Sequence, residues 1–274
     1  MLVEVGEAVS FVPRSGEHAL TEVVFGVTFS RLLNQAEIEA VVASHDVWKQ
    51  KLPRMSRIAA VEFAFGEVPP TDMPQHRSAG VIFDRYKPDG TLDLRLRVDE
   101  TGLFVNCLTY TRWAEVWREA FDLMSQVSRF IRGEAFISSV ILQCVDVFDW
   151  DGAPDEYDLH LLLKENPEVI PLFVFDSGLF WHSHHGRFFD ASDGRGRLLQ
   201  RVQLDGIEDQ DSKPIVKLEI YLQLQFARDM APHADSLGSY GMMNELFDPL
   251  HDRQKEIASS YLSGEICNRI GLNG

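Results

Sequence analysis

The residues with the clearest capacity for metal chemistry lie in a histidine-rich run in the second half of the chain. His182 and His184 are two positions apart, and Asp190 follows six positions after His184. Side chains two apart on a strand share a face, and imidazoles combined with a carboxylate are ligands of zinc and iron. The spacing allows a metal site of His182, His184 and Asp190, with Asp190 on the returning strand of a hairpin. We favour the alternative, histidines exposed on a hairpin strand, because no pattern nearby supplies residues that would orient the ligands.

A second candidate is a histidine in the C-terminal helical region. His251 follows Asp248 and precedes Asp252, and a histidine beside carboxylates can act as a general base. The alternative is a polar first helical turn, in which acidic residues stabilise the helix N-terminus. We favour this structural interpretation of His251.

Two polar residues interrupt an apolar stretch at the middle of the chain. Residues 136–150 read FISSVILQCVDVFDW, and Gln143 and Asp146 point to opposite faces of a strand because they are three positions apart. A buried aspartate must be paired or protonated, and Arg95 or Arg97 is a candidate partner. A structural polar contact between the two halves of the chain is the simpler interpretation, and binding of a ligand or partner is the alternative.

Residues 215–228 show the cleanest alternation of apolar and polar side chains. The apolar residues from Val216 to Phe226 are expected to face a core. The side chains expected to point away from it are Lys217, Glu219, Tyr221, Gln223 and Gln225. We predict that this wetter face, with Gln143 and Asp146, binds a protein partner or a small ligand.

Composition narrows the class of protein. The 274 residues are 45% hydrophobic and 25% charged, as in ordinary folded domains. A net charge of −16, from 42 acidic against 26 basic residues, repels phosphate and argues against nucleic-acid and anionic-membrane partners. The glycines fit hairpin turns and form no phosphate-binding loop or Gly-x-Ser-x-Gly elbow, so we expect no cofactor.

The cysteines and the N-terminal residues predict a cytoplasmic protein. Cys107, Cys144 and Cys267 are odd in number and have no paired spacing, which is typical of reduced core residues. The N-terminal residues lack the basic segment and apolar run of a signal peptide. No apolar run approaches the roughly 20 residues of a membrane span.

Periodicity predicts an α+β fold of two similar halves. Residues 1–20 are expected to form an arm, and residues 21–133 and 134–274 each read as strand, helix, four strands and long helix. The predicted strands cover residues 22–29, 59–65, 79–86, 92–98, 103–110, 136–148, 169–175, 178–185, 197–205 and 215–228. The predicted helices cover residues 34–51, 113–132, 157–164 and 237–262. The last helix is expected to break at Asp248-Pro249, because proline favours the first helical turn.

This order of elements predicts one continuous domain. Each half would form a curved antiparallel sheet with its long helix on one face, and the strand within residues 136–150 would join the halves. The order resembles the TATA-binding-protein fold in topology. A helix-grip fold, with a ligand pocket between the sheet and a long helix, is the alternative.

Three segments resemble an uncharacterised, sporadically distributed bacterial family of about this length. Residues 20–29, LTEVVFGVTF, are similar to its opening strand. The C-terminal helix is similar to its closing segment at Leu250, His251, Ile257 and Leu262. Where the family carries Gly-Leu-Arg-Tyr-Ile-Asn, this chain has Gln143, Cys144 and Asp146 in place of the arginine, tyrosine and asparagine. The resemblance implies no reaction, and these departures imply that any function of those polar positions is altered or lost.

These patterns together favour a non-enzymatic binding protein. No combination of residues completes a catalytic site, whereas the wetter face of residues 215–228 offers a surface for a partner. A metal-dependent enzyme that uses His182, His184 and Asp190 is the alternative.

Overall fold

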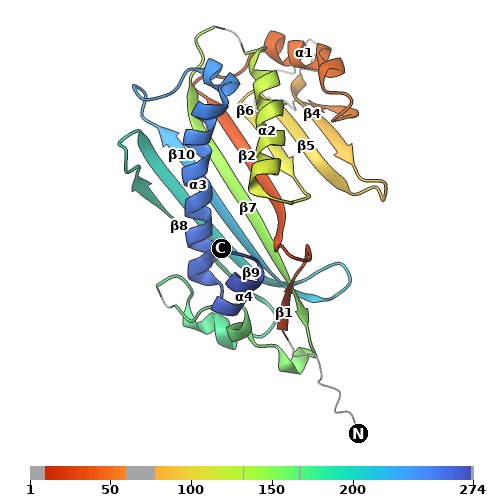
Figure 1. Ribbon diagram of the computed structural model, residues 1–274, viewed down its shortest axis with the longest axis vertical. Coiled ribbons are helices and arrows are strands. Elements are labelled where there is room, and N and C mark those ends of the chain that lie inside the picture. The colour runs from red at the N-terminus through yellow and green to blue at the C-terminus, as the bar shows by residue number, and fades with distance from the viewer. Residues whose placement is uncertain (1–9, 60–77, 132, 167, 273–274) are drawn as a thin grey trace, which may run out of the picture.

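The computed structural model describes residues 10–59, 78–131, 133–166 and 168–272. This part of the chain forms a mixed α+β fold of four α-helices and one ten-stranded antiparallel sheet that does not close (Figure 1). The strands are β1 (Ser10–Pro13), β2 (Leu20–Phe29), β3 (Arg54–Ala59), β4 (Ser78–Tyr86), β5 (Leu92–Asp99), β6 (Gly102–Cys107), β7 (Ile137–Asp151), β8 (Trp181–Asp190), β9 (Gly196–Glu208) and β10 (Pro214–Phe226). The helices are α1 (Gln35–Ala43), α2 (Trp113–Ser128), α3 (Tyr240–Tyr261) and α4 (Gly264–Arg269). The predicted fold class, an antiparallel α+β sheet, is confirmed.

Strand β7 lies at the centre of the sheet. The strand order is β3-β4-β5-β6-β2-β7-β10-β9-β8, and β1, from the predicted N-terminal arm, pairs with the end of β7. The side chains of β7 are buried on both faces of the sheet. Leu142 and Phe148 are buried on one face, and Val145 and Val147 are buried on the other. A strand apolar on both faces suits a central position. The prediction that residues 136–150 contain the central strand is therefore confirmed.

Helices α2 and α3 lie across the same face of the sheet (Figure 1). The apolar stripe of α2 is buried through Val116, Trp117, Ala120, Phe121, Leu123, Met124 and Val127. The rings of Trp117 and of Phe247 on α3 lie 4.6 Å apart, so the two helices also pack on each other. We call the opposite side of the sheet the open face, since no described helix packs on it.

The second half departs from the predicted order of elements. The predicted helix over residues 157–164 and the predicted strand over residues 169–175 are both wrong. Short 3₁₀ turns occupy this region at Pro154–Glu156, Leu159–Leu161 and Leu172–Asp176. Leu162 and Ile170 still reach the core, so apolar spacing here reflects packing of an irregular segment. Three strands follow β7 in the described residues, where four were expected, and the structure does not confirm the pseudo-repeat or the TATA-binding-protein likeness.

Several predicted helix boundaries are also corrected. The predicted break at Asp248-Pro249 is wrong, because α3 runs through Pro249 and begins after its N-cap Ser239. Leu246, Phe247 and Leu250 are buried on both sides of the proline, and this packing offsets its missing backbone hydrogen bond. Helix α1 ends at Ala43 and α2 at Ser128, both before their predicted ends. Of the predicted strand over residues 59–65, residues 60–65 lie outside the described residues.

Candidate functional site

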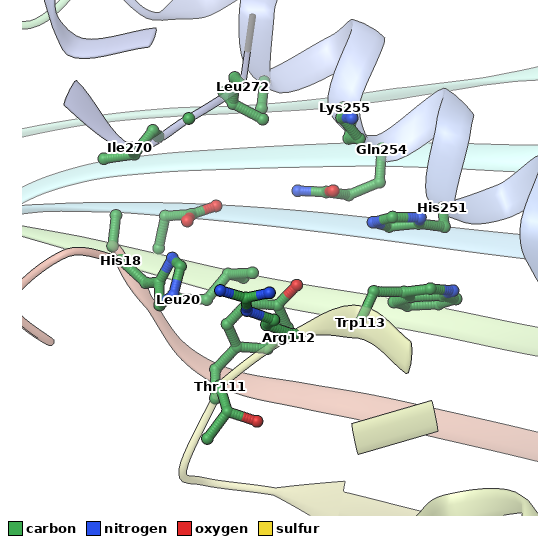
Figure 2. Close-up of a pocket in the computed structure, with 15 residues that line it drawn as sticks. His18, Leu20, Thr111, Arg112, Trp113, His251, Gln254, Lys255, Ile270 and Leu272 are labelled. Atoms are coloured by element: carbon green, nitrogen blue, oxygen red, sulfur yellow. The ribbon is translucent and has the colours of Figure 1, made fainter. Parts of the chain in front are cut away.

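A pocket of about 220 Å³ lies between the sheet and α3, beside the start of α2 (Figure 2). Four separate parts of the chain surround its floor on β7. They are residues 18–20, residues 110–113, residues 251–258 of α3 and residues 270–272 after α4. We call this space the Asp146 pocket, after the residue that β7 contributes.

Irregular backbone creates this space. Strand β2 pairs with β7, but its register shifts between Leu20 and Glu22, beside the pairing of Leu20 with Asp146. The chain also leaves the sheet after β6 and turns into α2 at Trp113. The regular pairing of β2 with β7 is therefore interrupted next to Asp146, at the place where α2 begins and does not yet cover the sheet.

Asp146 is buried on the helix-facing side of β7. It is 4% exposed, and its Oδ2 atom has no hydrogen-bond partner among the residues that the structure describes. Desolvation raises the pKa of the Asp146 carboxyl to about 7. The predicted pairing with Arg95 or Arg97 is wrong, because both arginines point to the open face, where Arg95 bonds Asp84 at 2.7 Å.

Gln254 is the second buried polar side chain at the pocket. It is 4% exposed, and Figure 2 shows its amide directed from α3 into the pocket. The Gln254 side chain lines the pocket together with Asp146. Buried polar groups in folded proteins almost always have partners. The Asp146 Oδ2 atom, which has no partner among the described residues, is an exception to this rule, and the pocket that Asp146 and Gln254 line has room for a ligand or ordered water.

His251 and Trp113 form one wall of the pocket. Their rings stack with centroids 3.8 Å apart and planes inclined by 2° (Figure 2). Burial, with a smaller effect of Lys255, lowers the pKa of His251 to about 4, so the imidazole is neutral at pH 7. The first-turn interpretation of His251 is wrong, because this residue lies in the interior of α3. Its role as a general base stays a prediction.

Basic side chains surround the exposed end of the pocket. Arg112 is exposed, and His18 and Lys255 are partly exposed. None of the three forms a salt bridge to a residue that the structure describes. The His18 ring packs edge-on against Tyr110 at 5.3 Å. The pocket thus combines a carboxyl group at its buried end with basic groups at its mouth.

The structure does not bring the predicted metal ligands together. His182 and His184 share a face of β8, with ring centroids 5.4 Å apart, as expected. Asp190 lies on the same strand and not on its hairpin return, so it is about 26 Å from His182 at the usual rise per residue. His184 instead contacts Asp205 of β9 at 2.7 Å. Across the described ranges, no group of three or more His, Cys, Asp or Glu side chains could hold a metal ion.

The polar residues of β10 lie on the open face with the predicted alternation. Their side chains are engaged with one another and with neighbouring strands. The contacts are Gln143 to Glu219 at 3.0 Å, Lys217 to Glu219 at 3.0 Å, Arg201 over the Tyr221 ring at 4.0 Å, Gln223 to Ser139 at 2.9 Å and Gln225 to Gln223 at 3.2 Å. Gln143 and Asp146 therefore belong to two different surfaces.

Sequence reasoning singled out Asp146 and His251 but did not join them. It missed His18, Arg112, Gln254 and Lys255, which come from three distant segments. Gln254 carried one usable signal, since it lies three residues after His251 and so on the same side of a helix.

Comparison with protein-family models and with curated proteins gives no match for this sequence. The resemblance to the uncharacterised bacterial family stays a prediction. No helix in the described residues is long and apolar enough to cross a membrane.

Proposed function

We propose that the protein is a binding protein that holds a small polar ligand in the Asp146 pocket. The observation that carries this proposal is the buried carboxyl group of Asp146, which lines the cavity and whose Oδ2 atom has no hydrogen-bond partner among the described residues. Leaving such a group unbonded costs about 1–3 kcal/mol, and a ligand donor would recover that free energy. A pocket with a few convergent polar groups is also the usual form of a small-molecule site.

The pocket is a stronger candidate than the open face. On the open face, polar side chains such as Glu219 and Gln223 already have partners. A partner protein bound there would have to replace those contacts. In the pocket, the Asp146 Oδ2 atom has no hydrogen bond to a described residue that a ligand would have to break. Binding of a protein on the open face stays a second proposal.

Proton transfer is another candidate function, and one specific observation favours it. Burial moves the pKa of Asp146 up to about 7 and that of His251 down to about 4 within one pocket. Titratable groups with pKa values displaced in opposite directions are common at acid–base active sites. An enzyme would convert the bound compound, whereas a binding protein would release it unchanged.

The test is recovery of a bound compound. Purified protein is incubated with a small-metabolite extract, separated from free compounds and denatured, and the released compounds are identified by mass spectrometry. We expect a compound enriched by the wild-type protein and lost with Asp146→Asn and with Ala258→Met, which fills the pocket. Glu219→Gln on the open face is the matched control and should retain it.

The outcomes separate the candidates. A compound recovered unchanged supports binding, and a converted compound supports proton-transfer catalysis. If nothing is enriched, or if both pocket variants retain the compound while folded by circular dichroism, the proposed function is wrong.

A further inference from the structure

We infer that the ligand is a small zwitterion whose cationic nitrogen binds Asp146 and Gln254 and whose anionic group binds Arg112 and Lys255. This inference rests on the proposed function and specifies the ligand class of the same pocket. It follows from the separation of acidic and basic groups between the two ends of the pocket.

The buried end favours a cation. In the described part of the chain Asp146 has no basic partner, and its burial disfavours the charged carboxylate. A ligand nitrogen that carries a positive charge restores the charged form and forms a charge-assisted hydrogen bond, which is stronger than a neutral one. The Gln254 amide is directed into the same space (Figure 2), and its oxygen is a second hydrogen-bond acceptor there.

The mouth favours an anion. Several arginines of the described chain form ion pairs with carboxylates and others form none, so only the unpaired ones leave a cationic group for a ligand. Arg14, Arg31, Arg57, Arg85 and Arg95 form such pairs. Arg112 and Lys255 instead lie at the pocket mouth without an ion pair to any described residue, beside His18. Guanidinium and ammonium groups both bind carboxylates, and the guanidinium can do so through two parallel hydrogen bonds.

Ligands with a single charge suit this pocket less well. A plain cation would be repelled by Arg112 and Lys255, with no anionic group of its own to bind them. A plain anion bound at the mouth would leave the Asp146 carboxyl without a donor. Only a molecule with both charges, held apart by an apolar spacer, matches both ends.

Volume and lining limit the length of the spacer. A space of about 220 Å³ holds about seven groups the size of a water molecule. Leu20, Ile270 and Leu272 line the pocket and can contact methylene groups. The matching probes are ω-amino acids with four to six carbons.

The experiment measures binding of three zwitterions by isothermal titration calorimetry. The probes are 4-aminobutanoate, 5-aminopentanoate and 6-aminohexanoate, each compared with the amine and the carboxylate of the same chain length. We expect at least one zwitterion to bind at least about tenfold more tightly than either singly charged analogue.

Variants assign each charge to its end of the pocket. Asp146→Asn should weaken zwitterion binding at least about tenfold and leave binding of the plain carboxylate unchanged. Lys255→Gln should weaken binding of the zwitterion and of the carboxylate, but not of the amine. Arg201→Gln on the open face is the control and should change nothing.

The outcomes distinguish this inference from the proposed function. If an amine or a carboxylate alone binds as tightly as the best zwitterion, the ligand class is wrong although the pocket binds small molecules. If no probe binds, the compound recovered from extract decides, since a neutral or singly charged compound overturns the inference and a zwitterion supports it. If no compound is recovered either, the proposed function fails, and the inference fails with it.

Discussion

Asp146 occupies a buried position on β7 where an apolar residue would make the folded protein more stable. Its neighbours on the same face, Cys144 and Phe148, are buried in the core. A carboxyl group there is desolvated and leaves one oxygen without a partner. Proteins often place such destabilising groups at functional sites, where a ligand supplies the missing contact.

The first prediction is that Asp146→Asn stabilises the protein at high pH. The folded-state pKa, about 7, lies above the ordinary value of 3.8, so the folded protein binds this proton more tightly than the unfolded chain. The contribution of the Asp146 carboxyl to the free energy of unfolding is fully present below pH 3.8 and is lost as the pH rises through 7. A shift of about three units corresponds to about 4 kcal/mol.

Urea denaturation at pH 4, 6 and 8 measures this effect. The asparagine variant should unfold with a free energy up to about 4 kcal/mol larger than wild type at pH 8, and similar to it at pH 4. Asp190→Asn, an exposed substitution on β8, should stay within about 0.5 kcal/mol of wild type throughout. A difference between Asp146→Asn and wild type that does not depend on pH would contradict the raised pKa.

At the scale of elements, local patterns predicted most of the regular structure. The stripe of α2 and the alternation of β10 follow directly from residue spacing, and Asn34 caps α1 as expected. Residues 157–175 were mispredicted because their apolar side chains match helix and strand periods while their backbone follows the space available in the core. Pro249 was mispredicted because burial of its neighbours outweighs the local cost of proline.

Local sequence patterns reveal single residues of the site but not which residues lie together in the fold. Asp146 is conspicuous as a polar residue in an apolar run, and His251 as a histidine between acids. Their common pocket depends on the crossing of α3 over β7, and no sequence spacing encodes that crossing. Lys255 and Arg112 look like ordinary surface residues until the fold places them at one opening.

The second prediction concerns the packing of α2 against α3. The indole Nε1 of Trp117, a fully buried residue, donates to Asn244 Oδ1 at 2.6 Å and is the polar contact between the two helices at this point. Asn244→Ala leaves that donor buried without a partner, which should lower the free energy of unfolding by about 1–3 kcal/mol.

A double-mutant cycle tests whether the lost stability comes from the hydrogen bond between Trp117 and Asn244. Trp117→Phe removes the donor, so Asn244→Ala in that background should cost clearly less than in wild type. Chemical denaturation of the four proteins gives the coupling energy. Equal costs of Asn244→Ala in both backgrounds would show that this hydrogen bond does not link the helices.

At the scale of the whole molecule, the sheet is continuous through the β2–β7 and β7–β10 pairings. One hydrophobic cluster includes Phe25 on β2, Trp117 on α2 and Phe247 on α3. Phe25 and Phe247 come from opposite halves of the chain, and their rings lie 5.7 Å apart. Side chains from both halves therefore pack in one shared core.

The third prediction follows from this shared core: residues 21–133 and 134–274 unfold together. Differential scanning calorimetry should show one transition whose calorimetric and van't Hoff enthalpies agree, at about 190 kcal/mol near 60 °C for a chain of 274 residues. Leu96→Ala on β5 and Leu204→Ala on β9 each remove a fully buried side chain from one half, and each should cost about 2–5 kcal/mol. Because the core is shared, either substitution should move the whole transition to lower temperature without splitting it. Two resolved transitions, with Leu96→Ala shifting only one of them, would show instead that the halves are separate folding units.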